Sequence, residues 1–364
     1  MRIAQIAPLV ESVPPRLYGG TERVVSFLTE ELVKQGHRVT LFASGDSHTS
    51  ASLIPCTPEA LRLSKVADHI PYYMVMLKRV RQMAFHFDVL HFHIEALHFP
   101  IFNGAHSKRT ITTLHNRQDV SDLDVLYSAF PDMGLVSISD AQRVAVPDAT
   151  FAGTIHHGLP RDLLVPTLRP SGGYLAFLGR ISPEKRVDRA IAIARAAGLP
   201  LKIAAKVDRA DEHYFRSEIE PLLTQSGVDF VGEISERQKA AFLGNALGLL
   251  FPIDWPEPFG LVMIEAMACG TPVLAFNHGS VPEIIDHGVT GFIVDDVEGA
   301  IGSVGSLLAL DRRRVRDRFV QRFTAERMAR NYVRIYEQLR VGSQARRLAV
   351  APGLAAHDTM VPGE

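Results

Sequence analysis

Apolar and polar positions change their spacing several times along this chain. Short apolar runs rich in β-branched residues alternate with longer segments in which apolar residues return every three or four positions. The first pattern is typical of buried strands and the second of amphipathic helices. Their alternation predicts parallel sheets with right-handed crossovers, because consecutive strands are then joined through helices. In the first half, strands are expected at 3–8, 38–43, 89–93, 110–114, 135–139 and 154–155, and a helix at 21–35.

A segment without periodicity interrupts this pattern at residues 159–173. It contains three prolines and two glycines, a composition typical of linkers. The alternation then restarts, so we predict two Rossmann-like α/β domains that face each other across a cleft. In the second half, strands are expected at 174–178, 201–205, 229–231, 247–251 and 272–275, and helices at 186–197, 211–225, 236–245 and 259–268.

The domain boundaries follow from this interruption. Residues 1–165 are predicted to form the first domain and residues 166–340 the second. The Arg-rich segment 312–340 is expected to be helical, to close the second domain and to pack back across the first. Residues 341–364 have no strong pattern and are predicted to be a disordered tail.

Composition and charge exclude several classes of protein. The 364 residues suit two domains, and a formal net charge of -1 gives no drive toward nucleic acid. The two cysteines, Cys56 and Cys269, form neither a disulfide framework nor a metal cluster, so we expect a reducing, cytoplasmic environment. We expect no signal peptide, and no run reaches the ~18 apolar residues of a membrane span.

The strongest chemical signal is the stretch EPFGLVMIEAMACGTPVLA, which begins at Glu257. Pro258 suits the first turn of a helix, because its missing N–H would be unpaired there anyway. The helix start near Phe259 and Gly260 then presents free N–H groups and a positive dipole end, which bind anions. Glu265 lies about two turns beyond Glu257, roughly 10 Å along the axis at ~1.5 Å per residue. One helix could therefore hold both ends of an extended ligand; the alternative is that both glutamates are ordinary surface charges.

A second stretch, FLGRISPEKR, begins at position 177, follows an expected strand and opens a helix. This order places it at the carboxyl edge of the second sheet, where α/β folds bind ligands. Arg180 offers a planar fork and Lys185 a point charge, so the two can grip a diphosphate and neutralise it as it departs. The alternative is a pair of solvated loop charges.

Two weaker signals lie in the first domain. Gly19 and Gly20 precede a helix and allow a backbone to approach a ligand closely, although they also fit a turn with no ligand. The fingerprint G-x-G-x-x-G is absent, which weakens a dinucleotide-binding dehydrogenase. His115 ends the strand expected at 110–114 and could bond a sugar hydroxyl, whereas a lone histidine is more often structural.

Pairs of histidines and aspartates invite a metal interpretation, but none has further ligands at zinc-like spacing. We interpret His91 and His93 as packing or cleft lining. Asp122 and Asp124 lie in an expected loop and not at the end of an apolar strand. No metal site is predicted.

In these motifs the chain resembles the retaining glycosyltransferases of family 4, which have the two-domain GT-B fold. The resemblance spans roughly residues 1–335 and rests above all on the two glutamates with their EPFG and ACGTP flanks. The further matches are the Gly19-Gly20 loop, His115, the Gly179-Arg180…Lys185 motif and the segment GSVPEII…GVTGFIV from position 279. One departure is the pair His157-Gly158, preceded by His156, where the family often has Asn-Gly.

The resemblance implies a role for each candidate residue. The first domain would face the acceptor, and the second would bind the donor. Arg180 and Lys185 would hold the donor diphosphate, and Glu265 would bind ribose hydroxyls. Together with Arg180 and Lys185, the catalytic set would contain Glu257 and His115, which meet the donor sugar. The further donor-binding residues would be Gly19, Gly20, Gly179, Glu233, Ile234, Phe259, Gly260 and Leu261, with Glu233 and Ile234 on the wall that receives the base.

The function implied is a retaining hexosyltransferase that uses a nucleotide-diphosphate sugar and needs no metal or other cofactor. The acceptor would be a saccharide, a lipid or a small molecule, contacted by loops such as 10–18 and 44–58. Two alternatives keep the fold: a nucleotide-sugar epimerase or phosphorylase, and a nucleotide-sugar-binding protein without catalysis.

The segment at residues 72–87 combines basic and apolar side chains, and this bears on where in the cell the protein works. It places Lys78, Arg79 and Arg81 beside an apolar stripe. Such a helix either touches an anionic membrane surface from the cytoplasmic side or buries its stripe in its own domain.

Overall fold

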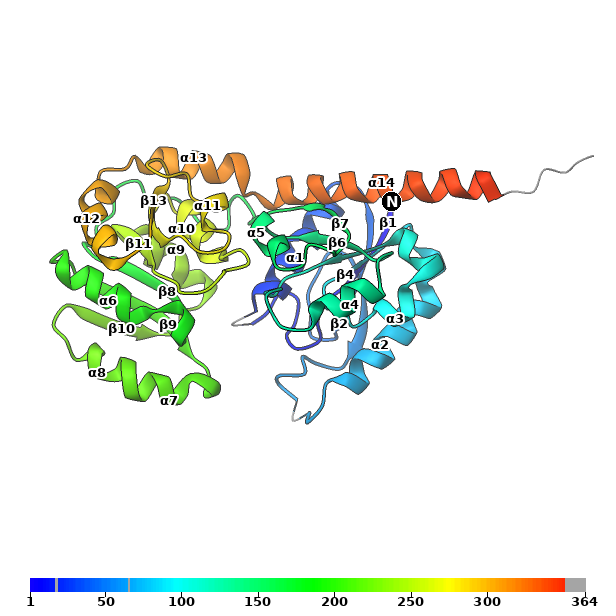
Figure 1. The fold of residues 1–364 in the computed structure, drawn as a ribbon, viewed down its shortest axis with the longest axis horizontal. Coiled ribbons are helices and arrows are strands. Elements are labelled where there is room, and N and C mark those ends of the chain that lie inside the picture. Colours follow the sequence, from blue (N-terminus) through cyan, green and yellow to red (C-terminus); the bar gives the residue numbers. More distant parts are fainter. Residues whose placement is uncertain (17–18, 65, 351–364) are drawn as a thin grey trace, which may run out of the picture.

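The structure is a computed structural model that describes residues 1–16, 19–64 and 66–350, with side chains described as far as residue 341. Figure 1 shows two α/β domains side by side, each built on its own sheet. The first sheet has seven parallel strands in the order β3-β2-β1-β4-β5-β6-β7. Its strands are β1 (Arg2–Ile6), β2 (Arg38–Ser44), β3 (Ser52–Thr57), β4 (Val89–Phe92), β5 (Thr110–Thr113), β6 (Gly134–Ser137) and β7 (Phe151–Thr154).

The second sheet has six parallel strands in the order β10-β9-β8-β11-β12-β13. The predicted pair of parallel, Rossmann-like α/β domains is therefore confirmed. The strands of this sheet are β8 (Leu175–Ile181), β9 (Leu201–Val207), β10 (Val228–Gly232), β11 (Gly248–Phe251), β12 (Val273–Phe276) and β13 (Gly291–Val294).

Helices cover both sheets, because the parallel strands are joined by crossovers that must bury an apolar face. The first domain holds α1 (Gly20–Lys34), α2 (Ile70–Met83), α3 (Phe99–Phe102), α4 (Leu123–Ala129) and α5 (Asp140–Val144). The second holds α6 (Val187–Ala196), α7 (Glu212–Tyr214), α8 (Glu220–Leu223), α9 (Glu236–Gly244), α10 (Leu261–Ala268), α11 (Val281–Ile284), α12 (Val297–Leu308) and α13 (Arg312–Arg322). The last helix is α14 (Ala325–Val350).

Two strands were not expected from the sequence. β3 occupies part of the segment 44–58, which was predicted to be a loop. It is an edge strand that is only partly buried, and it contains Pro55, a residue that strands accept mainly at sheet edges, so the segment was not recognised as a strand. β13 is the opposite edge of the second sheet, and three of its four residues are only partly buried.

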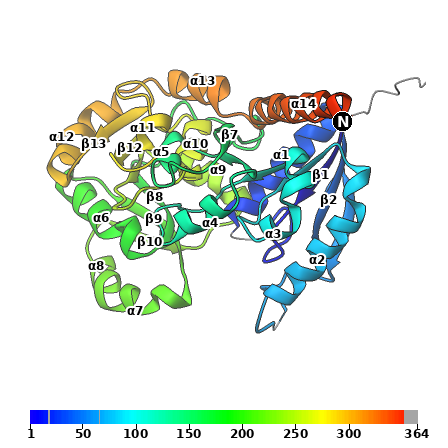
Figure 2. The ribbon, with the colours of Figure 1, turned by 45° about the vertical axis from the view of Figure 1, so that its right-hand side comes forward.

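The predicted helical segment 312–340 is two helices instead of one. The break lies at Phe323 and Thr324, where Leu159 of the linker forms a β-bridge with Thr324 and bonds the backbone on both sides of it. α13 covers the second domain and α14 runs along the first, as Figures 1 and 2 both show. The two connections between the domains therefore lie side by side.

The first domain holds α14 through a buried stripe. Met328, Tyr332 and Tyr336 lie in one apolar cluster with Ile3 of β1 and Leu28 of α1. The helix continues to Val350, so the boundary predicted at residue 341 falls inside it. The rest of the predicted tail, residues 351–364, lies outside the described residues.

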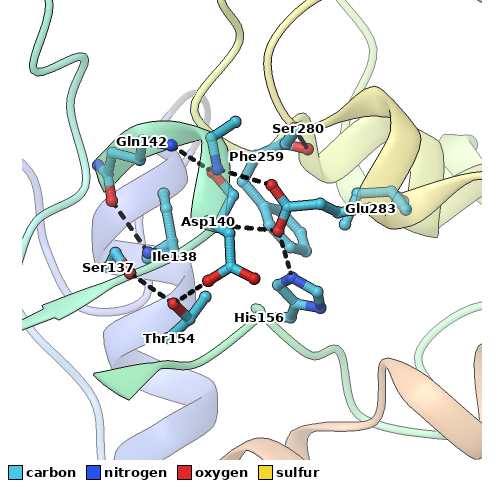
Figure 3. Close-up of polar contacts among 12 residues, drawn as sticks. Ser137, Ile138, Asp140, Gln142, Thr154, His156, Phe259, Ser280 and Glu283 are labelled. Carbon is cyan, nitrogen blue, oxygen red and sulfur yellow. Dashed lines mark hydrogen bonds and ion pairs between the residues drawn. The ribbon is translucent and has the colours of Figure 1, made fainter. Parts of the chain in front are cut away.

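A carboxylate of the second domain binds the start of α5 in the first domain (Figure 3). Glu283 of α11 accepts hydrogen bonds of 2.8 Å from the backbone amides of both Asp140 and Ala141, the first residues of α5. It also bonds Nε2 of His156 at 3.0 Å. Burial raises the pKa of Glu283, but the bonds from His156 and the two amides outweigh burial, so the pKa lies below its ordinary value.

This contact predicts an acid-dependent part of the stability. Because the folded pKa of Glu283 is depressed, the contact stabilises the protein above the ordinary value of 4.5 and fades as the pH falls through the folded value. We expect Glu283→Gln to cost about 1 kcal/mol at neutral pH. Melting temperatures of both proteins, measured from pH 7 into acid, should converge at the acid end. A difference that stays constant with pH would contradict the prediction.

Candidate functional site

A cleft of about 560 Å³ opens between the two domains. Its walls come from the carboxyl ends of both sheets, where parallel α/β folds bind ligands. The thirteen residues that were predicted to be catalytic or donor-binding all lie along this one cleft. They are Gly19, Gly20 and His115 of the first domain and Gly179, Arg180, Lys185, Glu233, Ile234, Glu257, Phe259, Gly260, Leu261 and Glu265 of the second.

The start of α10 opens onto the cleft. Gly260 has φ of 76°, in the left-handed region, and the helix begins at Leu261, two residues later than expected. The amides of Leu261 and Val262 have no partner within the helix, because the first-turn N–H groups lack a preceding carbonyl. Both residues line the cleft. The positive end of the helix therefore faces the cavity, as an anion site requires.

Arg180 and Lys185 reach the cleft from β8 and from the turn that follows it. Arg180 Nη2 lies 2.5 Å from Glu184 Oε1, and further atoms of its guanidinium lie 3.7 Å from Asp208 and 3.5 Å from Asp211. These three carboxylates hold the guanidinium at the cleft wall.

Lys185 forms an ion pair with the carboxylate of Glu257. Its Nζ also lies 4.6 Å from the centre of the Trp255 ring, a cation–π distance. Trp255 in turn donates a 3.1 Å hydrogen bond from Nε1 to Glu257. The predicted cation and the first glutamate are therefore one preorganised unit, and the neighbouring tryptophan was not singled out from the sequence.

Glu265 is almost fully buried, with 3% of its surface exposed. Lys239 Nζ and Arg23 Nη1 each lie 2.7 Å from its Oε1. Burial raises the pKa of Glu265, but Lys239 and Arg23 outweigh it, so the pKa lies below the ordinary value and the carboxylate is ionised. Arg23 and Lys239 were assigned no role from the sequence, because they are 242 and 26 residues from Glu265 along the chain.

His115 ends a chain of hydrogen bonds that runs into the first domain. Its Nε2 lies 2.9 Å from Nδ1 of His93, and His93 Nε2 lies 2.7 Å from Gln5 Oε1. Burial lowers the pKa of His115 to about 3, so the ring is neutral. His93 is buried in the middle of this chain of hydrogen bonds, which agrees with its interpretation as a packing residue. His157 stacks on His115 with ring centres 5.3 Å apart.

Further charged residues of the first domain also line the cleft. Glu11 and Glu22 are both buried, and Glu11 Oε1 lies 2.7 Å from Nε of Arg62. Burial, reinforced by the nearby charge of Glu11, raises the pKa of Glu22 to about 7. The sequence offered no signal for these residues, because they lie in irregular or helix-start segments.

No group of histidine, cysteine and acidic side chains among residues 1–16, 19–64 and 66–341 is arranged to hold a metal ion. Within the part of the chain that the structure describes, each helix is too short or too polar to cross a bilayer.

Two family matches cover most of the chain. Residues 18–198 match the family described as Glycosyltransferase Family 4. Residues 167–321 match the family described as Glycosyl transferases group 1. The two matched regions overlap at residues 167–198, and together they include the cleft residues of both domains from Gly19 to Glu265.

Curated glycosyltransferases are also similar to this chain in sequence. The chain is 28% identical over 233 residues to the D-inositol 3-phosphate glycosyltransferase of Mycobacterium marinum, a match that covers 57% of this chain and 47% of that protein. The chain thus spans about half the length of the curated relatives it matches.

Solved structures share the fold over nearly the whole chain. The sucrose-phosphate synthase of Thermosynechococcus elongatus superposes with a TM-score of 0.77 at 20% identity, covering 94% of this chain and 99% of that one. HepE of Anabaena, solved in complex with UDP and glucose, gives a TM-score of 0.70 at 17% identity, covering 93% and 100%. The shared architecture is the two-domain GT-B fold.

Proposed function

Since this chain belongs to glycosyltransferase family 4, we propose that it transfers a hexose from a nucleoside diphosphate sugar to a hydroxyl acceptor, with retention of anomeric configuration. One observation carries the proposal. The open start of α10, two cations and a buried carboxylate converge on a single interdomain cleft, in the order that a diphosphate and a ribose require. HepE, which shares the fold, was solved with UDP and glucose, and this supports the donor class.

The donor diphosphate would lie against the first turn of α10, between Arg180 and Lys185. Charge builds up on this diphosphate as the bond from the sugar C1 to the phosphate oxygen breaks. Cations and helix amides that are already in place stabilise that charge without reorganising, which is the main source of rate enhancement in such sites. Glu265, about one turn beyond the start of α10, would accept hydrogen bonds from the ribose.

Retention follows if the acceptor oxygen attacks C1 on the face that the phosphate leaves. The C1–oxygen bond breaks with its electron pair going to the phosphate, the acceptor oxygen forms the new bond, and its proton passes to the departing phosphate oxygen. No carboxylate nucleophile is then needed, in contrast to most glycoside hydrolases. Glu257, held by Lys185 and Trp255, and the neutral His115 would contact the hexose. We propose that the positive charge of Arg180 and Lys185 makes a metal ion unnecessary and that no other cofactor takes part.

Thermal stabilisation by a panel of UDP-, GDP-, ADP- and dTDP-sugars tests the donor class, because ligand binding raises the melting temperature by mass action. The stabilising donor is then incubated with saccharide, lipid and small-molecule acceptors in the presence of EDTA. The proposal expects a glycoside whose anomeric proton coupling matches that of the donor. Donor conversion without acceptor would indicate an epimerase, and binding without any product would indicate a sugar-nucleotide-binding protein.

We further propose that the enzyme works in the cytoplasm, in peripheral contact with an anionic membrane. The apolar stripe of α2, made of Tyr73, Met76, Leu77 and Val80, is buried in its own domain. The opposite side of the helix also carries apolar residues: Ile70, Met74 and Val75 are 51%, 48% and 63% exposed. Lys78 and Arg81 are exposed on the same helix. Apolar side chains beside cations are typical of helices that lie in a membrane interface.

Liposome co-sedimentation tests this contact. We expect the protein to sediment with vesicles that contain phosphatidylglycerol and to stay in the supernatant with pure phosphatidylcholine. Each cation near an anionic surface contributes about 1 kcal/mol, so replacing Lys78 and Arg81 together by glutamine should weaken binding more than tenfold. The proposed contact would be contradicted if the protein sedimented equally with both kinds of vesicle. It would also be contradicted if the double variant sedimented with the anionic vesicles as well as the wild type does.

A further inference from the structure

Four charged side chains from opposite walls of the cleft form one network. Arg23 of α1 belongs to the first domain, whereas Glu236 and Lys239 of α9 and Glu265 of α10 belong to the second. Arg23 Nη1 lies 2.7 Å from Glu265 Oε1, and Nη2 lies 2.8 Å from Glu236 Oε2. Lys239 Nζ lies 2.7 Å from the same Glu265 oxygen and 3.4 Å from Glu236. Two cations and two carboxylates balance, so the network has no net charge.

Three of the four side chains are largely removed from water, whereas the side chain of Glu236 is 33% exposed. The exposed fractions are 13% for the side chain of Arg23, 10% for Lys239 and 4% for Glu265. A buried charged side chain needs its oppositely charged partners, because leaving one charge unpaired away from water is strongly unfavourable. Arg23 is therefore part of the wall around Glu265 and not a solvated side chain that happens to lie near it.

The geometry divides the two oxygens of Glu265 between two tasks. Both cations contact Oε1, while Oε2 accepts no hydrogen bond from any side chain in the described ranges. An ionised carboxylate is an acceptor only, so Oε2 is available to a donor such as a sugar hydroxyl. The pair of cations thus keeps the carboxylate charged and fixes its orientation.

We propose that Arg23 is a positioning residue that completes the ribose site from the opposite domain, so that binding of a nucleoside diphosphate and closure of the cleft stabilise each other. This inference rests on the proposed function, because it takes Glu265 as the ribose ligand. Lys239 can hold Glu265 whatever the angle between the domains, since α9 and α10 move as one body. Arg23 can do so only when the cleft is closed. Linkage then requires that a ligand which uses the completed site favours the closed arrangement.

Calorimetric titration of UDP, GDP and inorganic pyrophosphate into the full chain tests this role. Pyrophosphate shares the diphosphate but lacks the ribose. In Arg23→Met, affinity for the nucleoside diphosphate that the wild type binds should fall about ten- to a hundredfold, as for loss of a charged hydrogen bond, while pyrophosphate affinity stays unchanged. Arg23→Lys should recover part of the loss. The KM for the donor should rise with little change in kcat, because the residue acts on binding.

Small-angle scattering measures the radius of gyration, which would not change if Arg23 acted only on the local geometry of Glu265. The radius of gyration of the free protein should increase in Arg23→Met and stay at the wild-type value in Lys239→Met, the matched control within one domain. Melting curves of Arg23→Met and Lys239→Met establish that the two variants fold. If Arg23→Met does not fold, the scattering and titration experiments are repeated with Arg23→Lys, for which smaller changes in the same direction are expected.

Several results would overturn the inference alone: nucleotide affinity unchanged in Arg23→Met, equal losses for nucleotide and pyrophosphate, or tighter nucleotide binding, which would make Arg23 a competitor of the ribose. A radius of gyration that is the same in all variants would also overturn it. Wild-type protein that binds neither UDP nor GDP, nor any donor of the thermal panel, would instead overturn the proposed function and this inference with it.

Discussion

Replacing Lys185 by alanine is expected to lower kcat by about a hundred- to a thousandfold, the usual loss when one preorganised charge-stabilising group is removed. Lys185 lies on the cleft wall, paired with Glu257 and packed on Trp255. In the proposed reaction its charge meets the departing diphosphate, where negative charge grows toward the transition state. The substitution should therefore act on kcat more strongly than on KM. Arg180→Ala is expected to have an effect of the same order.

Initial rates at saturating donor and acceptor measure this effect, and circular dichroism establishes that the variants fold. Lys202→Ala is a suitable control, because Lys202 is a lysine of the same domain that pairs with Asp229, and its side chain is 40% exposed. It should keep wild-type turnover. If both Lys185→Ala and Arg180→Ala turned over like the wild type, the assignment of the diphosphate site would be wrong.

Gly279→Ala is expected to lower activity strongly, because it displaces the backbone of Glu257. Gly279 has φ of 56°, and a Cβ placed on it would lie 2.4 Å from the backbone N and O of Glu257. The next residue, Ser280, donates its amide to Glu257 O at 3.0 Å and its hydroxyl to Phe259 O at 2.9 Å. The new methyl group must therefore displace the segment that carries the first glutamate and leads into α10.

Strain of this kind costs about 1–3 kcal/mol, and it falls on residues that contact the proposed donor. We expect a lower melting temperature together with a loss of turnover of at least about tenfold, since a displacement near 1 Å can cost two orders of magnitude in rate. Gly302→Ala in α12 is the matched control, because a Cβ there meets nothing within 4 Å. It should stabilise the protein slightly, as alanine favours helix, and leave turnover unchanged. Wild-type activity in Gly279→Ala would show that the Glu257 segment adapts freely.

The residues of the proposed donor site could be predicted from the sequence to lie together because they are close along the chain. Glu257, the start of α10 and Glu265 belong to one stretch, and strand–turn–helix order places Arg180 and Lys185 at the same sheet edge. Local rules of helix initiation, dipole and crossover suffice for such motifs. The same rules miss short edge strands such as β3 and β13, because partial burial leaves no repeating pattern.

The contacts across the domains depended on the tertiary structure. Nothing in the local pattern indicates that Arg23 meets Glu265, that Glu283 fastens α5 or that the tyrosines of α14 lie under the first sheet. Periodicity reports how each segment buries its own apolar face, and it carries no information on which distant charges meet when two finished domains close. The sequence by itself therefore determined the two α/β domains and the charged and helix-start groups of the proposed donor site. Only the packing of one domain against the other decided which partners hold that site in place, because a buried charge takes its partners from whatever the closed cleft brings within reach.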